Sequence, residues 1–236
     1  MIRRFIPLLA LSAILLFSCT VTQEVDLNTD GSGQFTTKVA IHPAFYENLE
    51  TMAVMSGQMD ADSQGLFDVE KIKADIEQKP GLKVKSIESP DPRTLIMTVT
   101  FDNIDDLLKD EEIAGTNMFS FTKNGTVSSA TIEISRDNFT AINSFVPEES
   151  QPMLDSFGPA SNEGISEEEY LEMMDFVLEN AAQIIGESAI NTKIKINGTI
   201  IEQNGGTRQG NTITYTIPLI DVLLLAEPLK YSVKFK

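Results

Sequence analysis

The chain contains a single cysteine, and the position of that cysteine limits how the protein can fold. Cys19 follows an apolar run from Phe5 to Phe17, and this run in turn follows Arg3 and Arg4. A single thiol allows neither an internal disulfide nor a thiolate metal site. The folded part of the chain must therefore be stabilised by an ordinary hydrophobic core.

The residues before Cys19 have the pattern of an export signal. The apolar run is about 13 residues long, whereas a helix that spans a membrane needs roughly 20 apolar residues. Basic residues before a short apolar run, and a small residue after it, are typical of a signal peptide. We predict that residues 1–18 are removed and that residues 19–236 form a single domain outside the cytoplasm.

The end of this segment also resembles a bacterial lipobox. Leu16, Ser18 and Cys19 occupy the −3, −1 and +1 positions of that motif, and Phe17 stands at −2, where a small residue is usual. The resemblance implies that Cys19 receives acyl chains such as palmitate. Each buried methylene contributes about 0.8 kcal/mol, and two chains give stable anchoring. We therefore expect the protein to be attached to the inner or outer membrane through Cys19.

The composition is strongly acidic. The chain has 35 Asp and Glu residues against 18 Lys and Arg, for a formal net charge of −17. Two of the basic residues, Arg3 and Arg4, lie in the predicted signal peptide. An acidic surface repels phosphate groups, which argues against nucleic-acid binding and against adsorption to anionic lipids. The covalent lipid is then the expected contact with the membrane.

The predicted mature part reads as a series of β-hairpins. Apolar and polar residues alternate on both sides of a glycine-rich turn at 28–33, which predicts a first hairpin over residues 21–41. A second hairpin is predicted from arms at 118–123 and 126–135, with Asn124-Gly125 as its turn.

Further strands are expected along the chain. The segment 94–102 is apolar on both faces, as is typical of a strand that is covered on both sides. A turn at 89–92 is expected before it. The remaining predicted strands cover 82–88, 190–196, 199–203, 213–217 and 229–235.

Helices are expected between the strands. The longest is predicted at 166–186, where Ser166 to Glu169 has the form of a capping box. Residues 147–165 are rich in Pro, Gly, Ser and Glu, which predicts a mobile surface loop. The other predicted helices begin at Pro43 and Asp68 or cover about 104–109, 137–143 and 219–225. Together these elements predict an α+β fold, in which antiparallel hairpins form a sheet with several covering helices.

Two segments carry a resemblance to a known family. The first runs from Val25 to Gly33 and places a D-G-S-G turn between two strands close to Cys19. The second runs from Gly210 to Asp221 and places a G-N-T strand before Pro-Leu and a short apolar helix. This pattern resembles the LppM-type domain of bacterial lipoproteins. The resemblance implies an α+β domain that faces the cell envelope and interacts with envelope lipids or glycolipids, and it brings no catalytic residues.

His42 is the only histidine, so a serine or cysteine hydrolase triad would have to use it as the base. It lies between a predicted strand and Pro43, where a loop or capping role is the simpler interpretation. No G-x-S-x-G motif accompanies it. We assign no catalytic residue, and a membrane-proximal esterase or phospholipase dependent on His42 stays open as an alternative.

No metal or cofactor is expected. Transition metals favour His and Cys, which are scarce in this chain. Acidic residues cluster between Asp102 and Glu112, but they lack the D-x-D-x-D-G pattern of a calcium loop. A solvated acidic surface is therefore the simpler interpretation of the cluster.

The predicted helix at 166–186 carries the candidate ligand-binding residues. Its wide apolar stripe includes two adjacent methionines, whose flexible thioethers suit irregular grooves for acyl chains or partner helices. Packing of the same stripe against the sheet is the alternative. The candidate residues are Tyr170, Met173, Met174, Val177 and Leu178.

Three functions follow from these observations. The preferred one is a non-enzymatic lipoprotein of the cell envelope that binds envelope lipid, glycolipid or a protein partner close to the membrane. The second is the esterase or phospholipase dependent on His42. The third is a structural spacer or surface antigen without a small ligand.

Overall fold

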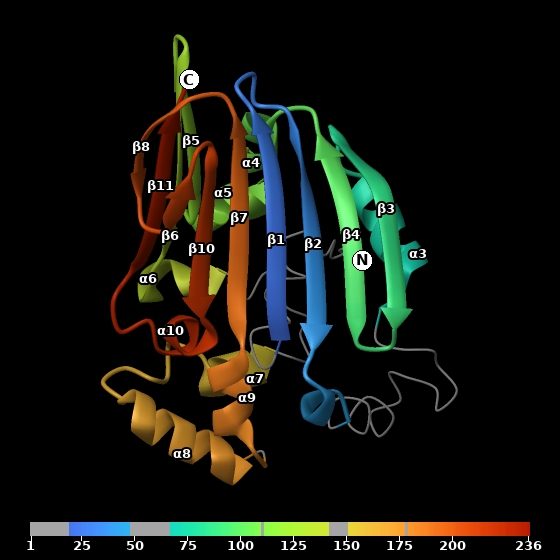
Figure 1. Cartoon of the computed structure of the whole chain (residues 1–236). Coiled ribbons are helices and arrows are strands. Elements are labelled where there is room, and N and C mark those ends of the chain that lie inside the picture. The colour runs from blue at the N-terminus through green and yellow to red at the C-terminus, as the bar shows by residue number, and fades with distance from the viewer. Residues whose placement is uncertain (1–18, 48–66, 110, 142–150, 178) are drawn as a thin grey trace.

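The computed structural model describes residues 19–47, 67–109, 111–141, 151–177 and 179–236, and within them the chain forms two β-sheets surrounded by helices (Figure 1). The predicted signal peptide lies outside the described residues. The larger sheet contains, in spatial order, β3 (Leu82–Asp91), β4 (Thr94–Phe101), β2 (Gly33–Ile41), β1 (Cys19–Asn28), β7 (Ala189–Asn197), β10 (Thr212–Pro218) and β9 (Thr207–Gln209). The smaller sheet contains β5 (Phe119–Asn124), β6 (Val127–Ile134), β11 (Leu229–Phe235) and β8 (Ile200–Asn204). The predicted α+β class is confirmed.

The first hairpin forms as predicted. β1 and β2 pair in antiparallel fashion, beginning with Cys19 opposite Ile41. In the turn, the backbone amide of Asn28 donates to the carbonyl of Ser32 at 2.9 Å. Gly31 has a φ of 99°, a conformation that glycine adopts without steric cost. The sole cysteine of the sequence is therefore the first residue of β1.

A parallel pair joins two strands that are far apart in the sequence, in the middle of the larger sheet. β1 pairs with β7 in parallel, with Val21 opposite Ile190. β7 pairs in antiparallel fashion with β10. The hairpins themselves were predictable from local patterns, but the parallel pair was not. Strands so far apart in the sequence leave no local signal of their partnership.

The other side of the larger sheet differs from the prediction in two respects. β3 continues beyond its predicted end at Glu88 to Asp91, with an irregular register in the segment that was predicted as a turn. There the hydroxyl of Ser89 donates to the carbonyls of Asp91 and Thr94, each at 2.9 Å. β4 is covered on one face, not on both, because Ile96 is only half-buried.

The smaller sheet contains the second predicted hairpin, with a shifted turn. Asn124 pairs with Val127, so the two residues of the turn are Gly125 and Thr126. The prediction of Asn124-Gly125 was therefore one residue too early. Gly125 has a φ of 64° and occupies the first central position, where a type II′ turn requires glycine.

The two sheets pack face to face around a shared core. Ile196 and Ile213 of the larger sheet and Phe235 of the smaller sheet are completely buried in this cluster. The chain passes from β8 to β9, and thus from one sheet to the other, at Gly205 and Gly206. A Cβ on either glycine would lie 2.7 Å from a tyrosine ring carbon, of Tyr231 or Tyr215 respectively. Only glycines fit this crossing.

Some of the helices lie behind the larger sheet in Figure 1, and others lie at its lower end. They are α3 (Val69–Glu77), α4 (Ile104–Leu108), α5 (Glu111–Thr116), α6 (Arg136–Phe139), α7 (Gln151–Phe157), α8 (Glu167–Val177), α9 (Ala181–Glu187) and α10 (Leu219–Leu224). Residues 43–47 are also helical, and the predicted continuation of that helix lies outside the described residues. Among the described residues, no helix has both the length and the apolar character needed to cross a bilayer.

The predicted long helix at 166–186 is wrong, because it is divided into α8 and α9. The division falls at Asn180, which has a φ of 63°. Asparagine tolerates this left-handed conformation better than most residues. The predicted capping box is confirmed: the amide of Glu169 donates to the Ser166 hydroxyl at 3.3 Å, and the Ser166 amide donates to the Glu169 carboxylate at 3.0 Å.

The predicted loop at 147–165 is wrong over residues 151–157, which form α7. Residues 147–150 lie outside the described part. The segment after α7 is held onto the core by Asn162, which is 1 % exposed. Its amide nitrogen donates to the carbonyls of Phe157 at 2.8 Å and of Leu223 at 3.1 Å. Asn162 is one of the polar residues of the predicted loop, and its side chain makes these hydrogen bonds to the core.

Candidate functional site

The larger sheet has one face over which none of the described elements lies, and this face is turned toward the viewer in Figure 1. Side chains alternate between the two faces of a sheet along each strand. On β1 and β7, the residues that point to this face are polar. They include Glu24, Asp26, Lys193 and Lys195. Lys193 and Glu24 form an ion pair at 3.3 Å.

The strand register places four polar residues in one row across this face. Asp26 lies opposite both Lys195 and Gln34, and Gln34 lies opposite Thr100. The ammonium of Lys195 is 3.6 Å from one carboxylate oxygen of Asp26. The side-chain amide of Gln34 donates to the other carboxylate oxygen at 3.1 Å.

A second row lies at the end of the strands. The side-chain amide of Asn197 donates to Asn28 at 2.8 Å, and that of Asn28 donates to the Ser32 hydroxyl at 3.0 Å. Ser32 in turn donates to Asp30 from its hydroxyl at 2.7 Å and from its backbone amide at 2.9 Å. These two hydrogen bonds hold the pKa of the Asp30 carboxyl below its ordinary value. Through Ser32, the turn of the first hairpin is thus hydrogen-bonded to the second row.

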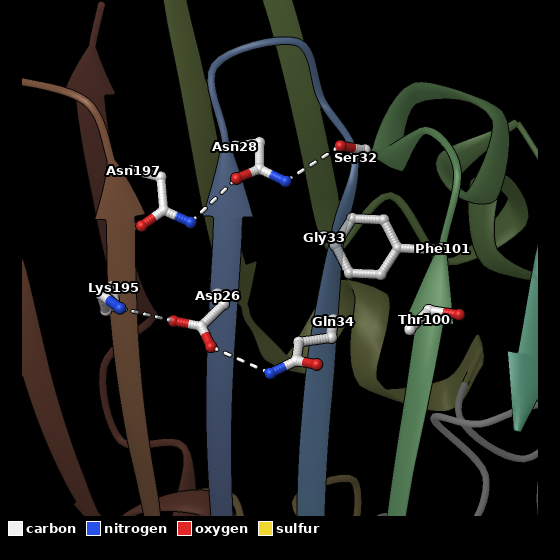
Figure 2. Close-up of a pocket in the computed structure, with 9 residues that line it drawn as sticks. All are labelled: Asp26, Asn28, Ser32, Gly33, Gln34, Thr100, Phe101, Lys195 and Asn197. Carbon is white, nitrogen blue, oxygen red and sulfur yellow. Dashed lines mark hydrogen bonds and ion pairs between the residues drawn. The ribbon is translucent and has the colours of Figure 1, made fainter. Parts of the chain in front are cut away.

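The two rows line a cleft of about 340 Å³, shown in Figure 2. Gly33 forms part of its wall. A Cβ at Gly33 would lie 2.3 Å from the carbonyl oxygen of Asp26 and 2.6 Å from the ring of Phe101, so only glycine fits there. The lining residues are Asp26, Asn28, Ser32, Gly33, Gln34, Thr100, Phe101, Lys195 and Asn197.

The cleft has the chemistry of a polar binding surface. Its amide, carboxylate, ammonium and hydroxyl groups can exchange their mutual hydrogen bonds for those of a polar, hydroxyl-rich ligand. Small-molecule pockets, by contrast, are mostly apolar. Asp26 lies seven residues beyond Cys19 along β1, which corresponds to roughly 23 Å at a rise of about 3.3 Å per residue. The cleft is therefore distant from the residue at which the chain is predicted to be anchored.

His42 lies at the opposite end of β2 from the cleft. Its carbonyl accepts hydrogen bonds from the amides of Phe45 at 3.1 Å and Tyr46 at 3.0 Å, which begin the helical residues 43–47. The Nδ1 atom of His42 is buried and has no hydrogen-bond partner among the described residues. In a hydrolase triad, this nitrogen donates to a carboxylate. The hydrogen bonds to its carbonyl give His42 a capping role at the start of the helical residues 43–47.

The acidic residues near α4 have structural partners. The ammonium of Lys109 lies 2.5 Å from Asp105 and 3.8 Å from Asp106. Asp110 and the side chains of Glu111 and Glu112 lie outside the described part. Over the part of the chain that the structure describes, no group of three His, Cys, Asp or Glu residues is placed to hold a metal ion.

The structure separates the predicted ligand-binding residues into two groups. Tyr170 and Met174 are buried in a core formed with α9 and α10, and Met173 packs against this core while half-buried. The Tyr170 hydroxyl donates to the carbonyl of Phe157 at 2.9 Å, and burial raises the pKa of this hydroxyl well above its ordinary value. Val177, by contrast, is 55 % exposed. Leu178 lies outside the described residues.

One exposed residue of α8 was missed by the sequence analysis. Phe176 is 93 % exposed, the highest value among the large hydrophobic residues described. It lies off the apolar stripe of the helix, two residues after the buried Met174. The available signal was an aromatic residue outside the helical period that directly follows Asp175.

No model of a known protein family matches the chain, and no curated protein matches it. Among solved structures, the chain is distantly similar to the folded domain of the LppM protein of Mycobacterium tuberculosis, determined by NMR. The two share 10 % sequence identity with a TM-score of 0.44, over 93 % of this chain and 90 % of that domain.

Proposed function

We propose that this chain is a lipoprotein of the cell envelope, anchored through acyl chains on Cys19, whose domain binds a ligand or partner without catalysing a reaction. One observation supports the anchoring above all. β1 begins at Cys19, and Cys19 already pairs with Ile41 of β2. The predicted cleavage therefore falls directly before the first residue of β1.

This arrangement has a physical consequence for the anchored protein. Where a linker separates the lipid from the domain, the domain moves over a distance set by the linker length. Here the first residue after the predicted cleavage belongs to the central strands of the larger sheet. The start of β1 then lies at the membrane surface, and the polar cleft faces away from it.

Anchoring is tested by growing cells with an alkyne analogue of palmitate and measuring the mass of the protein. The wild type is expected to carry the label and to lack residues 1–18. Cys19→Ala is expected to lose the label and to keep those residues. Thr20→Ala, which changes the neighbouring exposed residue, is the matched control and is expected to remain labelled. An exported wild type with an unmodified thiol would contradict the proposal.

The non-enzymatic part of the proposal is supported by the Nδ1 atom of His42, which has no carboxylate or other hydrogen-bond partner within the described ranges. It is tested separately with short-chain and long-chain ester substrates. We expect the purified protein to show the same background hydrolysis as its His42→Ala variant. Hydrolysis by the wild type that disappears in His42→Ala would instead establish the esterase alternative.

A further inference from the structure

Helix α8 ends in two exposed apolar residues. Phe176 is 93 % exposed and Val177 is 55 % exposed, and among the described large hydrophobic residues only Ile201, at 46 %, is also exposed. Exposed apolar residues that lie side by side form a candidate contact surface. The position of α8 in the fold indicates what that is.

Helices α8 and α9 lie at the end of the sheet where β1 begins. β7 runs parallel to β1, with Val21 opposite Ile190, so both strands start at the same end. α9 ends at Glu187, two residues before β7, and α8 packs against α9. In Figure 1, α8 accordingly lies beyond the lower end of the sheet, below β10 and β7, at the end where β1 starts.

We propose that the last turn of α8 is a second contact with the bilayer that anchors Cys19, with Phe176 and Val177 inserted among the lipid headgroups. This inference rests on the proposed function, because a lipid on Cys19 brings the bilayer to this end of the domain. No linker separates Cys19 from the sheet. Aromatic side chains are enriched at the level of the headgroups in membrane proteins.

The core fixes the direction in which Phe176 projects. Tyr170 is completely buried and Met174 is 6 % exposed, so one side of α8 is held against α9 and α10. Phe176 follows Met174 by two residues, which is about 200° around a helix. It therefore projects away from the core and cannot be buried by a small rotation of the helix.

The charged residues around Phe176 determine which lipid headgroups the proposed α8 contact favours. Glu172, Asp175 and Glu179 are exposed beside it. Asp175 also accepts a hydrogen bond from the amide of Ala182 at 2.7 Å, which ties the end of α8 to α9. Carboxylates repel anionic headgroups within about 10 Å at moderate salt. The contact therefore favours zwitterionic lipids, and negatively charged lipids weaken it.

The absence of tryptophan from the chain permits a direct test. Phe176→Trp introduces a single fluorophore at the proposed contact. Ile201→Trp introduces one on β8, which follows the other end of β7, where Asn197 lies opposite Asn28. Each full-length variant is expressed in bacteria, and the lipoprotein is reconstituted in phosphatidylcholine vesicles whose acyl chains carry bromine. We expect at least about twofold quenching of the indole fluorescence in Phe176→Trp and no quenching in Ile201→Trp.

Equal fluorescence of Phe176→Trp with and without brominated lipid, in protein whose mass shows acylated Cys19, would overturn the inference and leave the proposed function intact. Protection of the same indole from a water-soluble quencher without quenching by brominated lipid would also overturn it, because a protein would then cover α8. Addition of phosphatidylglycerol is expected to reduce the lipid quenching, and unchanged quenching would contradict the preference for zwitterionic lipid.

If the mass shows no lipid on Cys19, the proposed function fails, and the α8 contact is tested independently of it. The Cys19 thiol is then coupled to a maleimide lipid in the same brominated vesicles. Quenching in the Phe176→Trp variant but not in the Ile201→Trp variant would still support the contact. Absence of quenching in both coupled variants would exclude it.

Discussion

Gly33 shows how a single residue shapes the cleft. It has no side chain where the backbone of β1 and the ring of Phe101 approach most closely. Phe101 stacks on Phe35 with ring centroids 6.3 Å apart, so its ring has a packed neighbour. The wall of the cleft therefore depends on the absence of one methyl group.

Gly33→Ala is expected to lower the free energy of unfolding by about 1–3 kcal/mol, since the added methyl overpacks the site. The backbone oxygen of Asp26, 2.3 Å from the new Cβ, belongs to a central strand and has little freedom to move. Urea unfolding measures the change. Gly186→Ala in α9, where a Cβ meets nothing within 4 Å, is the control and is expected to gain about 0.5–1 kcal/mol. Equal stability of the two variants would contradict this account.

Arg136 is a second residue whose role is structural. Its guanidinium donates to the carbonyls of Leu225 at 3.0 Å and Asn162 at 3.3 Å, and also to those of Pro159 and Leu224. Leu225 has a φ of 40° and is 2 % exposed. This left-handed conformation costs roughly 1–2 kcal/mol for a residue other than glycine. Arg136 therefore stabilises a strained end of α10.

Arg136→Ala is expected to destabilise the domain by about 2–3 kcal/mol, because several buried carbonyls lose their donors. Arg136→Lys is expected to recover less than half of that loss, since an ammonium lacks the planar fork of a guanidinium. Thermal unfolding of the wild type and the two variants checks that stability falls from wild type to Arg136→Lys to Arg136→Ala. Lys230→Ala removes a surface cation 2.7 Å from Glu133 and should change stability by less than about 1 kcal/mol. A comparable loss in Lys230→Ala would show that charge alone is responsible.

Among the elements, α8 begins with a capping box whose contribution to stability is lost at low pH. Hydrogen bonds from the Ser166 amide and hydroxyl hold the pKa of Glu169 below its ordinary value of 4.5. A carboxyl whose pKa is lower in the folded state stabilises that state above the unfolded pKa. This contribution is lost as the pH falls through the folded pKa. The start of α8 should therefore loosen in acid before the core does.

Glu169→Gln is expected to remove this part of the acid dependence. In the wild type, hydrogen-exchange protection of the first turn of α8 should decrease as the pH falls below about 4.5. In Glu169→Gln, protection should be lower at neutral pH and nearly constant with pH. Glu168→Gln removes the same charge one residue earlier and leaves the capping pair intact, so it should retain the wild-type profile. Identical profiles for the two variants would exclude the capping role.

Some helices and strands could be predicted from local sequence patterns alone, and others could not. The first hairpin, α3 and the closing strand β11 follow from local alternation, turn residues and caps, and these signals are complete within a few residues. The division of α8 from α9 at Asn180 was missed because the apolar stripe continues across it. The helix α7 was missed because its polar residues resemble those of a loop.

The candidate site was predictable only in part. The pattern around Cys19 is local, so the sequence could indicate an anchor there. The cleft combines residues of β1, β2, β4 and β7, and its rows exist only once the parallel register of Asp26 with Lys195 is known. Phe176 was missed for a different reason: exposure depends on which side of a helix the core covers.

The whole molecule has two chemically different ends. The polar cleft lies near the turn of the first hairpin, whereas Cys19, α8 and α9 lie at the other end of the same strands. The β-sheet connects these ends rigidly. An anchored domain would thus present the cleft to the aqueous space while α8 faces the lipid, and the distance between them is fixed by the length of β1.

This orientation depends on the short connection between lipid and sheet. Full burial of a large apolar side chain contributes about 1.5–3 kcal/mol, so the partial burial of Phe176 and Val177 is too weak to hold α8 on the bilayer without the anchor. The local concentration of a tethered group falls as roughly the −3/2 power of the tether length. An inserted linker should therefore release α8 while the protein stays attached.

Insertion of about 12 Gly and Ser residues between Cys19 and Thr20 gives a tether with a root-mean-square length of roughly 19 Å. In the Phe176→Trp background, we expect quenching by brominated lipid to fall at least about twofold, while the fraction of protein bound to vesicles is unchanged. A Pro-rich insertion of similar residue number, which is stiffer and more extended, should reduce the quenching further. If both insertions leave the quenching of the introduced indole unchanged, α8 binds the bilayer through its own affinity and the short connection does not orient the domain.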